Sequence, residues 1–434
     1  MEFQLGLLKK MNSIKPIRIL HIYFFNSLTG YKPGWDRFDT ITELLRERGY
    51  DVWILGFTQN WLGIKRKILG NIDIDLKNKI INITQPRWLA SINVLFHNFI
   101  LIGGIDLGHA VLLYKVCKNL KIHTIILADN MIGTNFCFLL MKKIFRMKIN
   151  TIIDYQDLIA RLSIFFSKSK NTLKKIISIT VDEVINPKLA KKIITITNFG
   201  REFLFYRSKI NKGFTIPHIS KFNPELNLKI NKEETKKHLG YDPKYFIFIW
   251  SGYLGGFTTN DILFLINDIL FLIKGISMSK YRDNILLLLT GYSPNYYINY
   301  IYSYAKKLNV NVKHVGYLDK KTYMQYLQAS DVGVFIRPRT LFAHFLTGGK
   351  VFDYMLAGLP VIVPCLKGQL EVIKGNGLCY KPEDVKDLAM KIDKILEMDL
   401  DYMGYISRQI VESNLKYVIE LMNSKEFLDF IINC

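Results

Sequence analysis

The sequence has few cysteines and no long uninterrupted apolar stretch. Its 434 residues include five cysteines, and no two of them form a Cys-x-x-Cys pair. An odd number of widely spaced cysteines excludes a disulfide scaffold and a zinc ribbon, and predicts reduced thiols. The N-terminus lacks the apolar core of a signal peptide. No segment reaches the roughly 18 apolar residues of a membrane span.

The most apolar stretch, residues 93–114, is interrupted by His97, Asn98, Asp106 and His109. It is read as a pair of buried helices or as a face that docks on a surface. Either interpretation excludes a membrane span, because four polar side chains would have to cross the bilayer core.

Several nucleotide- and nucleic-acid-binding motifs are also missing. The first predicted strand is not followed by Gly-x-Gly-x-x-Gly, and Gly349-Lys350 lacks the flanking residues of a Walker loop. The sequence shows no helix-turn-helix, zinc-finger or RNP-like pattern, and its eight histidines have no metal-site spacing. These absences argue against a nicotinamide enzyme, a P-loop NTPase and a nucleic-acid partner.

Positive charge is abundant. Lys and Arg number 59 against 37 Asp and Glu, which gives a net charge of +22. This excess favours an anionic membrane or a phosphorylated substrate as partner, although a solvated basic surface would explain it equally well. Trp53, Trp61 and Trp88 in the first half would suit an acceptor at a membrane surface.

Short β-branched runs alternate with helical patterns in both halves, which predicts parallel sheets covered by helices. The predicted strands are 17–25, 51–57, 124–129, 150–157 and 191–198, then 245–256, 284–292, 312–318, 330–338 and 359–364. A break rich in Pro and Asn separates the two sets. We therefore expect an α/β domain over 1–215, a second over 216–400, and a helical tail over 401–434 that packs back on the first.

A possible phosphate-binding loop lies in the second half. In FLTGGKVFDYMLAGLPVIVP, Gly358 and the following proline close a short helix that begins near Gly348, Gly349 and Lys350. A helix N-terminus offers free N–H groups and partial positive charge, glycines admit a close ligand, and the lysine adds a full charge. The loop is thus a plausible seat for a diphosphate, or an ordinary turn before a helix.

The order of these elements closely resembles the GT-B glycosyltransferases of the large retaining group 1 family. The resemblance covers most of the chain and is carried by IRILHIYFF, LLRERGYDVWIL, IIDYQDL, KKIITITNFGREFLFYR, FTIPHISKFNPE, IFIWSGYLGG, HVGYLDKKTYMQYLQASDVGVFI, FDYMLAG and KGQLEVIKGNGLCYKPEDV. It implies two Rossmann-like, doubly wound domains facing each other across a cleft. It also implies transfer of a sugar from a nucleotide-sugar donor to a glycan or lipid-linked acceptor, with retention of configuration.

The resemblance assigns roles to residues. Asp353 stands where the family binds the donor ribose, Tyr317 where it frames the base, and Arg337 could replace the cations missing from SGYLGGFTT. Two glycines of the first loop match the loop that approaches the donor phosphates, with Arg37 as the nearest cation. The implied donor-binding residues are Gly30, Gly34, Gly252, Tyr317, Arg337, Gly348, Gly349, Lys350, Asp353, Leu370 and Glu371.

Two side chains depart from the family pattern. Gln156 stands where many members have a histidine, and Phe345 where they have a glutamate. Glutamine can bind a sugar but cannot shuttle a proton, so Asp154 and Asp157 are candidates for the proton transfer. Gln156 and Asp157 are the predicted catalytic residues. The departures leave two alternatives open: a GT-B-shaped binding or partner subunit with weakened activity, and a nucleotide-sugar epimerase.

The resemblance implies no metal and no cofactor. An Asp-x-Asp pair, Asp73 and Asp75, is of the kind that GT-A enzymes use, but it lies outside the donor-like half and is interpreted as a solvated surface stretch. Asp399 and Asp401 form a second chance match. We expect a cytoplasmic protein, with the inner face of the membrane as a candidate location.

Overall fold

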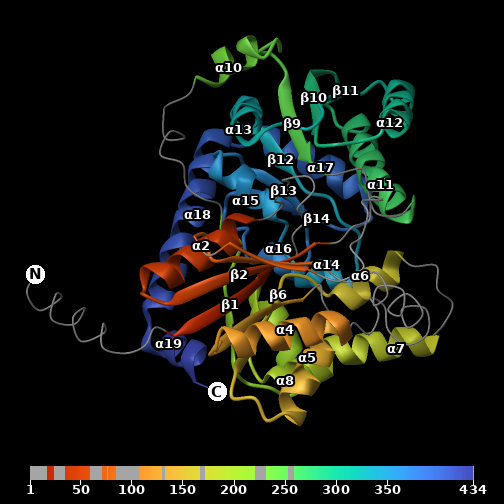
Figure 1. Cartoon of the computed structure of the whole chain (residues 1–434). Coiled ribbons are helices and arrows are strands. Elements are labelled where there is room, and N and C mark those ends of the chain that lie inside the picture. Colours follow the sequence, from red (N-terminus) through yellow and green to blue (C-terminus); the bar gives the residue numbers. More distant parts are fainter. Residues whose placement is uncertain are drawn as a thin grey trace, which may run out of the picture.

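The computed structural model describes residues 17–23, 35–58, 71–75, 77–84, 107–129, 132–166, 172–219, 231–252 and 259–433. Figure 1 shows two α/β domains, each built on a sheet covered by helices. Within these residues the first sheet has the order β3-β4-β2-β1-β5-β6-β7-β8 and the second the order β11-β10-β9-β12-β13-β14. The prediction of two doubly wound α/β domains is confirmed.

The first domain contains parallel strands, with one antiparallel strand, β3, at the edge beside β4. Its strands are β1 (Arg18–Tyr23), β2 (Asp51–Thr58), β3 (Asn71–Asp75), β4 (Ile80–Thr84), β5 (Thr124–Ala128), β6 (Asn150–Tyr155), β7 (Ile193–Thr195) and β8 (Gly213–Thr215). Its helices are α2 (Trp35–Glu47), α4 (Leu107–Asn119), α5 (Ile132–Ile144), α6 (Ile159–Phe166), α7 (Thr172–Thr180), the π-helix η1 (Val181–Ile185), α8 (Asn186–Ala190) and α9 (Asn198–Ser208).

The second domain has only parallel pairs among its described strands. Its elements are α10 (Lys232–His238), β9 (Phe246–Ser251), α11 (Thr259–Ser277), the 3-10 turn η3 (Arg282–Asn284), β10 (Ile285–Thr290), α12 (Asn295–Lys307), β11 (Asn311–His314), α13 (Lys320–Ala329), β12 (Val332–Val334), α14 (Leu341–Phe345), α15 (Gly349–Leu356), β13 (Val361–Pro364), α16 (Lys367–Leu370), β14 (Gly377–Tyr380) and α17 (Val385–Leu396). Two further helices, α18 (Leu400–Asn423) and α19 (Lys425–Ile432), complete the chain.

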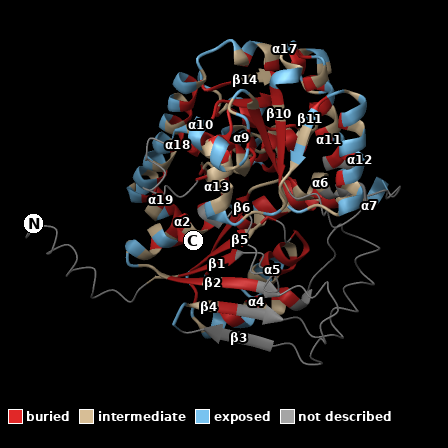
Figure 2. Cartoon of the chain, turned by 90° about the horizontal axis from the view of Figure 1, so that it is seen from above, coloured by how far each residue is buried: buried red, intermediate tan, exposed pale blue. Residues whose placement is uncertain are grey.

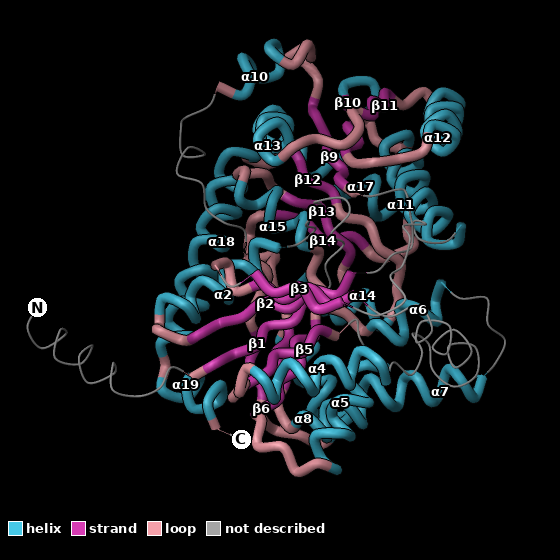
Figure 3. Tube along the Cα trace, in the orientation of Figure 1, coloured by secondary structure: helices cyan, strands magenta, loops and turns pink. Residues whose placement is uncertain are grey.

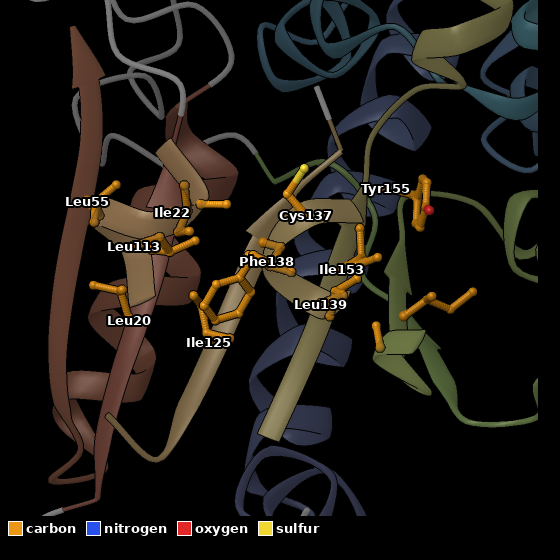
Figure 4. Close-up of a cluster of buried hydrophobic side chains, with 14 of the residues drawn as sticks. Leu20, Ile22, Leu55, Leu113, Ile125, Cys137, Phe138, Leu139, Ile153 and Tyr155 are labelled. Carbon is orange, nitrogen blue, oxygen red and sulfur yellow. The ribbon is translucent and has the colours of Figure 1, made fainter. Parts of the chain in front are cut away.

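The central strands of both sheets are buried because helices cover the sheets, as Figure 2 shows. In Figure 4, Leu113 from α4 and Phe138 from α5 lie against Leu20, Ile125 and Ile153 of the first sheet. Such continuous apolar runs are typical of parallel strands that are covered on both faces.

The structure bears on two expectations about surface residues, one for the tryptophans of the first domain and one for the segment of Asp73 and Asp75. Trp53 is buried in the core on β2, so it is not available to a membrane, while Trp61 and Trp88 lie outside the described residues. The segment of Asp73 and Asp75, expected to be a solvated surface stretch, forms the edge strand β3 of the first domain. Its alternation of isoleucine with polar residues is typical of a strand.

The helical tail returns to the first domain, as Figure 3 shows for α18 and α19. Near its start, the Ser407 hydroxyl donates to the carbonyl of Leu359 in the second domain (2.7 Å). At its end, the Lys192 ammonium and the Asn150 amide of the first domain donate to main-chain carbonyls of α19, including that of Phe430 (2.6 Å and 3.1 Å). The tail therefore contacts both domains and connects them.

The expectation of reduced thiols is wrong for one pair, because Cys365 and Cys379 form a disulfide. They lie 14 residues apart in sequence. Cys365 directly follows β13, and Cys379 lies on the neighbouring parallel strand β14, in register with Val363 of β13. Cys117 and Cys137 are buried and do not belong to a disulfide. Cys365 and Cys379 meet because β13 and β14 are neighbours in the sheet, and the spacing of the cysteines in the sequence does not reveal this order.

None of the described helices is both long enough and apolar enough to cross a membrane. Of the apolar stretch 93–114, only the part that belongs to α4 is described, and there Ala110 and Leu113 are buried against the first sheet.

Candidate active site

The two domains share an apolar core where α14 of the second meets the first. The Phe345 ring lies against Gly200, and its face is met edge-on by the Phe203 ring at 6.4 Å. The Thr197 hydroxyl donates to the main-chain carbonyl of Phe345 at 2.6 Å. Phe345, at the position where the resemblance expects a glutamate, is therefore buried between the two domains.

The N-terminus of α15 lies at the same junction. Gly348 is the N-cap residue, and a Cβ there would lie 2.6 Å from the Phe335 ring. Gly349 is open by comparison, because the nearest atoms to a Cβ belong to the His218 ring, at 3.9 Å and 4.0 Å. The first N–H groups of a helix have no partners within it. The free amide end of α15 thus lies beside the interdomain segment.

Lys350 provides a cation at this helix end. Its ammonium lies 4.7 Å from the centre of the Trp250 ring and 6.0 Å from that of Phe335. No carboxylate of the described residues lies within 4.0 Å of it. Desolvation, and next the Arg337 guanidinium, lower the pKa of Lys350 to about 7, against the attraction of two nearby aspartates.

Arg337 lies next to this lysine but is paired. Its Nη1 donates to the buried carboxylate of Asp268 on α11 at 2.7 Å, and its guanidinium lies 5.0 Å from the centre of the Phe335 ring. Burial raises the pKa of Asp268 to about 6, although the guanidinium opposes this shift. The Arg337 guanidinium is therefore a second positive group near the N-terminus of α15, but the Asp268 carboxylate neutralises part of its charge.

The turn after β6 carries the two catalytic candidates from the first domain. The Asp129 carboxylate accepts hydrogen bonds from the main-chain N–H groups of Gln156 (2.6 Å) and Asp157 (2.7 Å). The Oδ1 atom of Asp157 is buried and has no hydrogen-bond partner among the residues that the structure describes. Burial raises the pKa of Asp157 to about 7, and the Arg337 guanidinium of the other domain opposes the shift. Asp157 can therefore exchange a proton near neutral pH.

Replacing Asp157 with asparagine is expected to remove a pH-dependent loss of stability. The folded-state pKa of about 7 lies above the ordinary value of 3.8. The wild-type contribution of this group is therefore complete below about pH 4 and is lost as the pH rises to about 7. Urea unfolding across this range should show the variant gaining on the wild type up to pH 7. A difference that stays constant with pH would contradict the raised pKa.

Asp154 and Arg37 are occupied by each other. Both are buried, and the guanidinium donates to the two carboxylate oxygens at 2.5 Å and 2.8 Å. The Nε of Arg37 donates to the carbonyl of Ile216 in the interdomain segment at 3.0 Å. These contacts leave Arg37 no free role as a phosphate cation and remove Asp154 from the catalytic candidates.

Glu371 is engaged at a helix end of the first domain. Its carboxylate accepts hydrogen bonds from the main-chain N–H groups of Asn198 (2.9 Å) and Phe199 (2.8 Å), where α9 begins. The charge stabilises the positive end of that helix. Leu370 beside it is exposed. The structure therefore shows an interdomain contact for Glu371, and its predicted position along the donor stays a prediction.

The remaining predicted donor residues lie on the second domain or outside the described chain. Gly252 follows β9 and donates to the Thr290 carbonyl at 3.0 Å, with no room for a Cβ beside the Trp250 ring. Tyr317 is 63% exposed on the loop after β11. Asp353 lies one turn after Lys350 on α15. Gly30 and Gly34 are outside the described residues.

Sequence reasoning missed His218 and Asp268. The His218 ring lies 5.8 Å from the Phe352 ring and hydrogen-bonds the backbone of Thr347. Desolvation, and next the Arg37 charge, lower the pKa of His218 to about 4, so the imidazole is neutral. Asp268 could have been found as the one acidic residue in the apolar pattern ILFLINDILFLI. His218 could have been found as a polar residue directly after the proline of the interdomain break.

Comparisons with known proteins agree with this architecture. Residues 250–398 match the model of the family described as Glycosyl transferases group 1. No curated protein matches the chain. Residues 250–398 are therefore similar to the group 1 glycosyltransferases, and the resemblance drawn from the motifs is confirmed for this part of the chain.

Similar solved structures extend over nearly the whole chain. HepE of Anabaena, in complex with UDP, has a TM-score of 0.61 at 14% identity and covers 94% of this chain and 100% of its own. A glycosyltransferase from Rickettsia africae ESF-5 has a TM-score of 0.61 at 18% identity, with coverages of 96% and 99%. WaaG, a glycosyltransferase involved in lipopolysaccharide biosynthesis, has a TM-score of 0.61 at 13% identity, with coverages of 94% and 100%. The chain thus has the GT-B fold of these structures.

Proposed function

We propose that this protein transfers a sugar from a nucleotide-sugar donor to a glycan or lipid-linked acceptor. The observation that carries the proposal is the ammonium of Lys350, which lies beside the free amide end of α15 without a carboxylate within 4.0 Å in the described chain. HepE was solved in complexes with UDP and with UDP-glucose, which supports a uridine-nucleotide donor here.

The chemistry follows from the charge that develops. As the bond between the anomeric carbon and the phosphate oxygen breaks, negative charge grows on the departing diphosphate. The α15 amides and Lys350 would stabilise it, with Arg337 as a weaker, paired contributor. A diphosphate would also raise the pKa of Lys350 and hold it charged. The proposal therefore assigns the stabilising role to side chains and a helix end, without a resident metal.

The first domain would orient the acceptor. The unpaired Oδ1 of Asp157 is an acceptor for a sugar hydroxyl, and Gln156 can donate or accept beside it. In a transfer with retention, the acceptor oxygen forms the new bond to the anomeric carbon and its proton passes to the departing phosphate oxygen. Retention is part of the proposal through the family resemblance, and Asp157 then positions the hydroxyl.

A second candidate function is a binding or partner subunit with the same shape. It is favoured by Gln156 at the family histidine position and by the buried, apolar Phe345 at the glutamate position. An epimerase acting on the nucleotide sugar is the third. Both would use the same α15 end to hold the nucleotide, so they differ from the transferase only in what happens to the sugar.

A donor assay separates the three functions. The purified chain is incubated with UDP-glucose and a panel of other nucleotide sugars, with a chelator and with added divalent cations. We expect release of the nucleoside diphosphate in the chelator. Binding of UDP by calorimetry without release from any donor would favour the binding subunit, and a changed sugar without release would favour the epimerase. Release only with an added cation would contradict the metal-independent proposal.

The acceptor and the location complete the proposal. The net charge of +22 supports an acceptor held at an anionic membrane, on the cytoplasmic face.

A further inference from the structure

Large apolar side chains are exposed where α5 ends. Ile144 is 63% exposed, Phe145 57% and Leu140 39%. Leu140 and Ile144 lie four residues apart, so they are neighbours on one face of the helix. The Phe145 ring lies 5.5 Å from the Tyr114 ring of α4, which shows that the two helices meet there. Single exposed apolar residues are common, but a group at one helix end indicates an interaction surface.

Basic side chains surround this group. Lys143 and Arg146 are exposed next to Ile144 and Phe145, and Lys118 is exposed one turn after Tyr114 on α4. Leu140, Ile144, Phe145, Lys118, Lys143 and Arg146 are called the α4–α5 patch below. Between residues 107 and 149 the only acidic residue is Asp129, which is buried. The patch therefore has an apolar centre and a positive rim without an acidic neighbour in this segment.

The patch is separate from the transfer site. Figure 1 shows α4 and α5 on the side of the first domain that faces away from β9–β14. The helix α5 leads into the amino end of β6, whereas Asp157 follows its carboxyl end. Since α5 has 13 residues, the two ends of this unit are about 20 Å apart.

We propose that the α4–α5 patch docks the protein on an anionic membrane. Isoleucine, phenylalanine and leucine at the centre would enter the interfacial region, while lysine and arginine at the rim would contact anionic headgroups. A second copy of this chain is disfavoured, because a symmetric contact through the same surface would bring like charges together. A nucleic acid would use the rim, but it would leave the apolar centre without a partner.

Vesicle sedimentation of the full chain tests the proposal. We expect binding to vesicles of phosphatidylcholine mixed with phosphatidylglycerol, weaker binding at high salt, and little binding to phosphatidylcholine alone. The double variants Ile144→Ser/Phe145→Ser and Lys143→Glu/Arg146→Glu should each lower the binding about tenfold or more. Matched controls on α12 of the second domain, Tyr296→Ser/Tyr300→Ser and Lys306→Glu/Lys307→Glu, should bind like the wild type.

The outcomes are distinct. Equal binding by the patch variants and the wild type would overturn the proposal, as would equal losses in the α12 controls, which would indicate a diffuse effect of net charge. Binding to single-stranded RNA that matches vesicle binding and survives Ile144→Ser/Phe145→Ser would indicate a polyanion surface instead. Thermal unfolding checks that the variants fold. Release of the nucleoside diphosphate in solution should be unchanged in them, so failure of docking and failure of the transferase proposal are distinguishable.

Discussion

Replacing Lys350 with methionine is expected to lower donor turnover by about two to three orders of magnitude. The variant keeps an unbranched apolar stem against Trp250 but removes the positive charge beside the α15 amides. The loss should appear in kcat/KM for release of the nucleoside diphosphate. Folding should be preserved, because the ammonium has no ion-pair partner within 4.0 Å in the described chain.

Two further variants make this test specific. Lys306→Met removes an exposed lysine from α12 and should leave turnover unchanged, whereas Lys350→Arg should retain part of it. The lowered pKa of about 7 adds a pH dependence: the ammonium form declines as the pH rises through 7. The wild-type kcat/KM should therefore fall above pH 7 relative to Lys350→Arg, whose guanidinium stays charged. A ratio that does not change with pH would argue against this role for the lysine.

Replacing Arg37 with methionine is expected to lower the free energy of unfolding by about 3–5 kcal/mol. The change leaves the Asp154 carboxylate buried without its partner, and the Ile216 carbonyl without the guanidinium donor. Urea unfolding monitored by circular dichroism measures the loss. The effect should be large because both side chains are almost completely buried.

A double variant separates the value of the pair from the penalty for an isolated charge. Arg37→Met/Asp154→Leu should recover much of the stability, since two apolar side chains can replace a buried ion pair. If Arg37→Met alone changed the unfolding free energy by less than about 1 kcal/mol, a buried, isolated carboxylate could not be its result.

The parts of the structure that could be predicted are those encoded by neighbouring residues. The apolar runs of β5 and β6 predict buried parallel strands, because a strand covered on both faces needs no polar alternation. The helix start at Gly349 could be predicted for a similar reason, since the glycines, the lysine and the closing Gly358 lie within one short segment.

The parts that could not be predicted depend on distant partners. Glu371 contacts Phe199 across 172 residues, and Arg37 pairs with Asp154 across 117. Local spacing reveals neither contact. It left Arg37 as a possible phosphate cation, whereas the donor role of Glu371 came from the family resemblance and stays a prediction. The Cys365–Cys379 disulfide was missed for the same reason, because it depends on which strands are neighbours in the sheet.

The contact between Phe345 and the first domain has a consequence for the pace of the reaction. Parting the two halves would expose a buried phenyl ring and release two amide groups from the Glu371 carboxylate. These contacts favour the closed arrangement of the two domains. Release of the nucleoside diphosphate would then be slower than sugar transfer. A variant that weakens the contact between Phe345 and the first domain would therefore have a higher kcat and would bind the nucleotide less tightly.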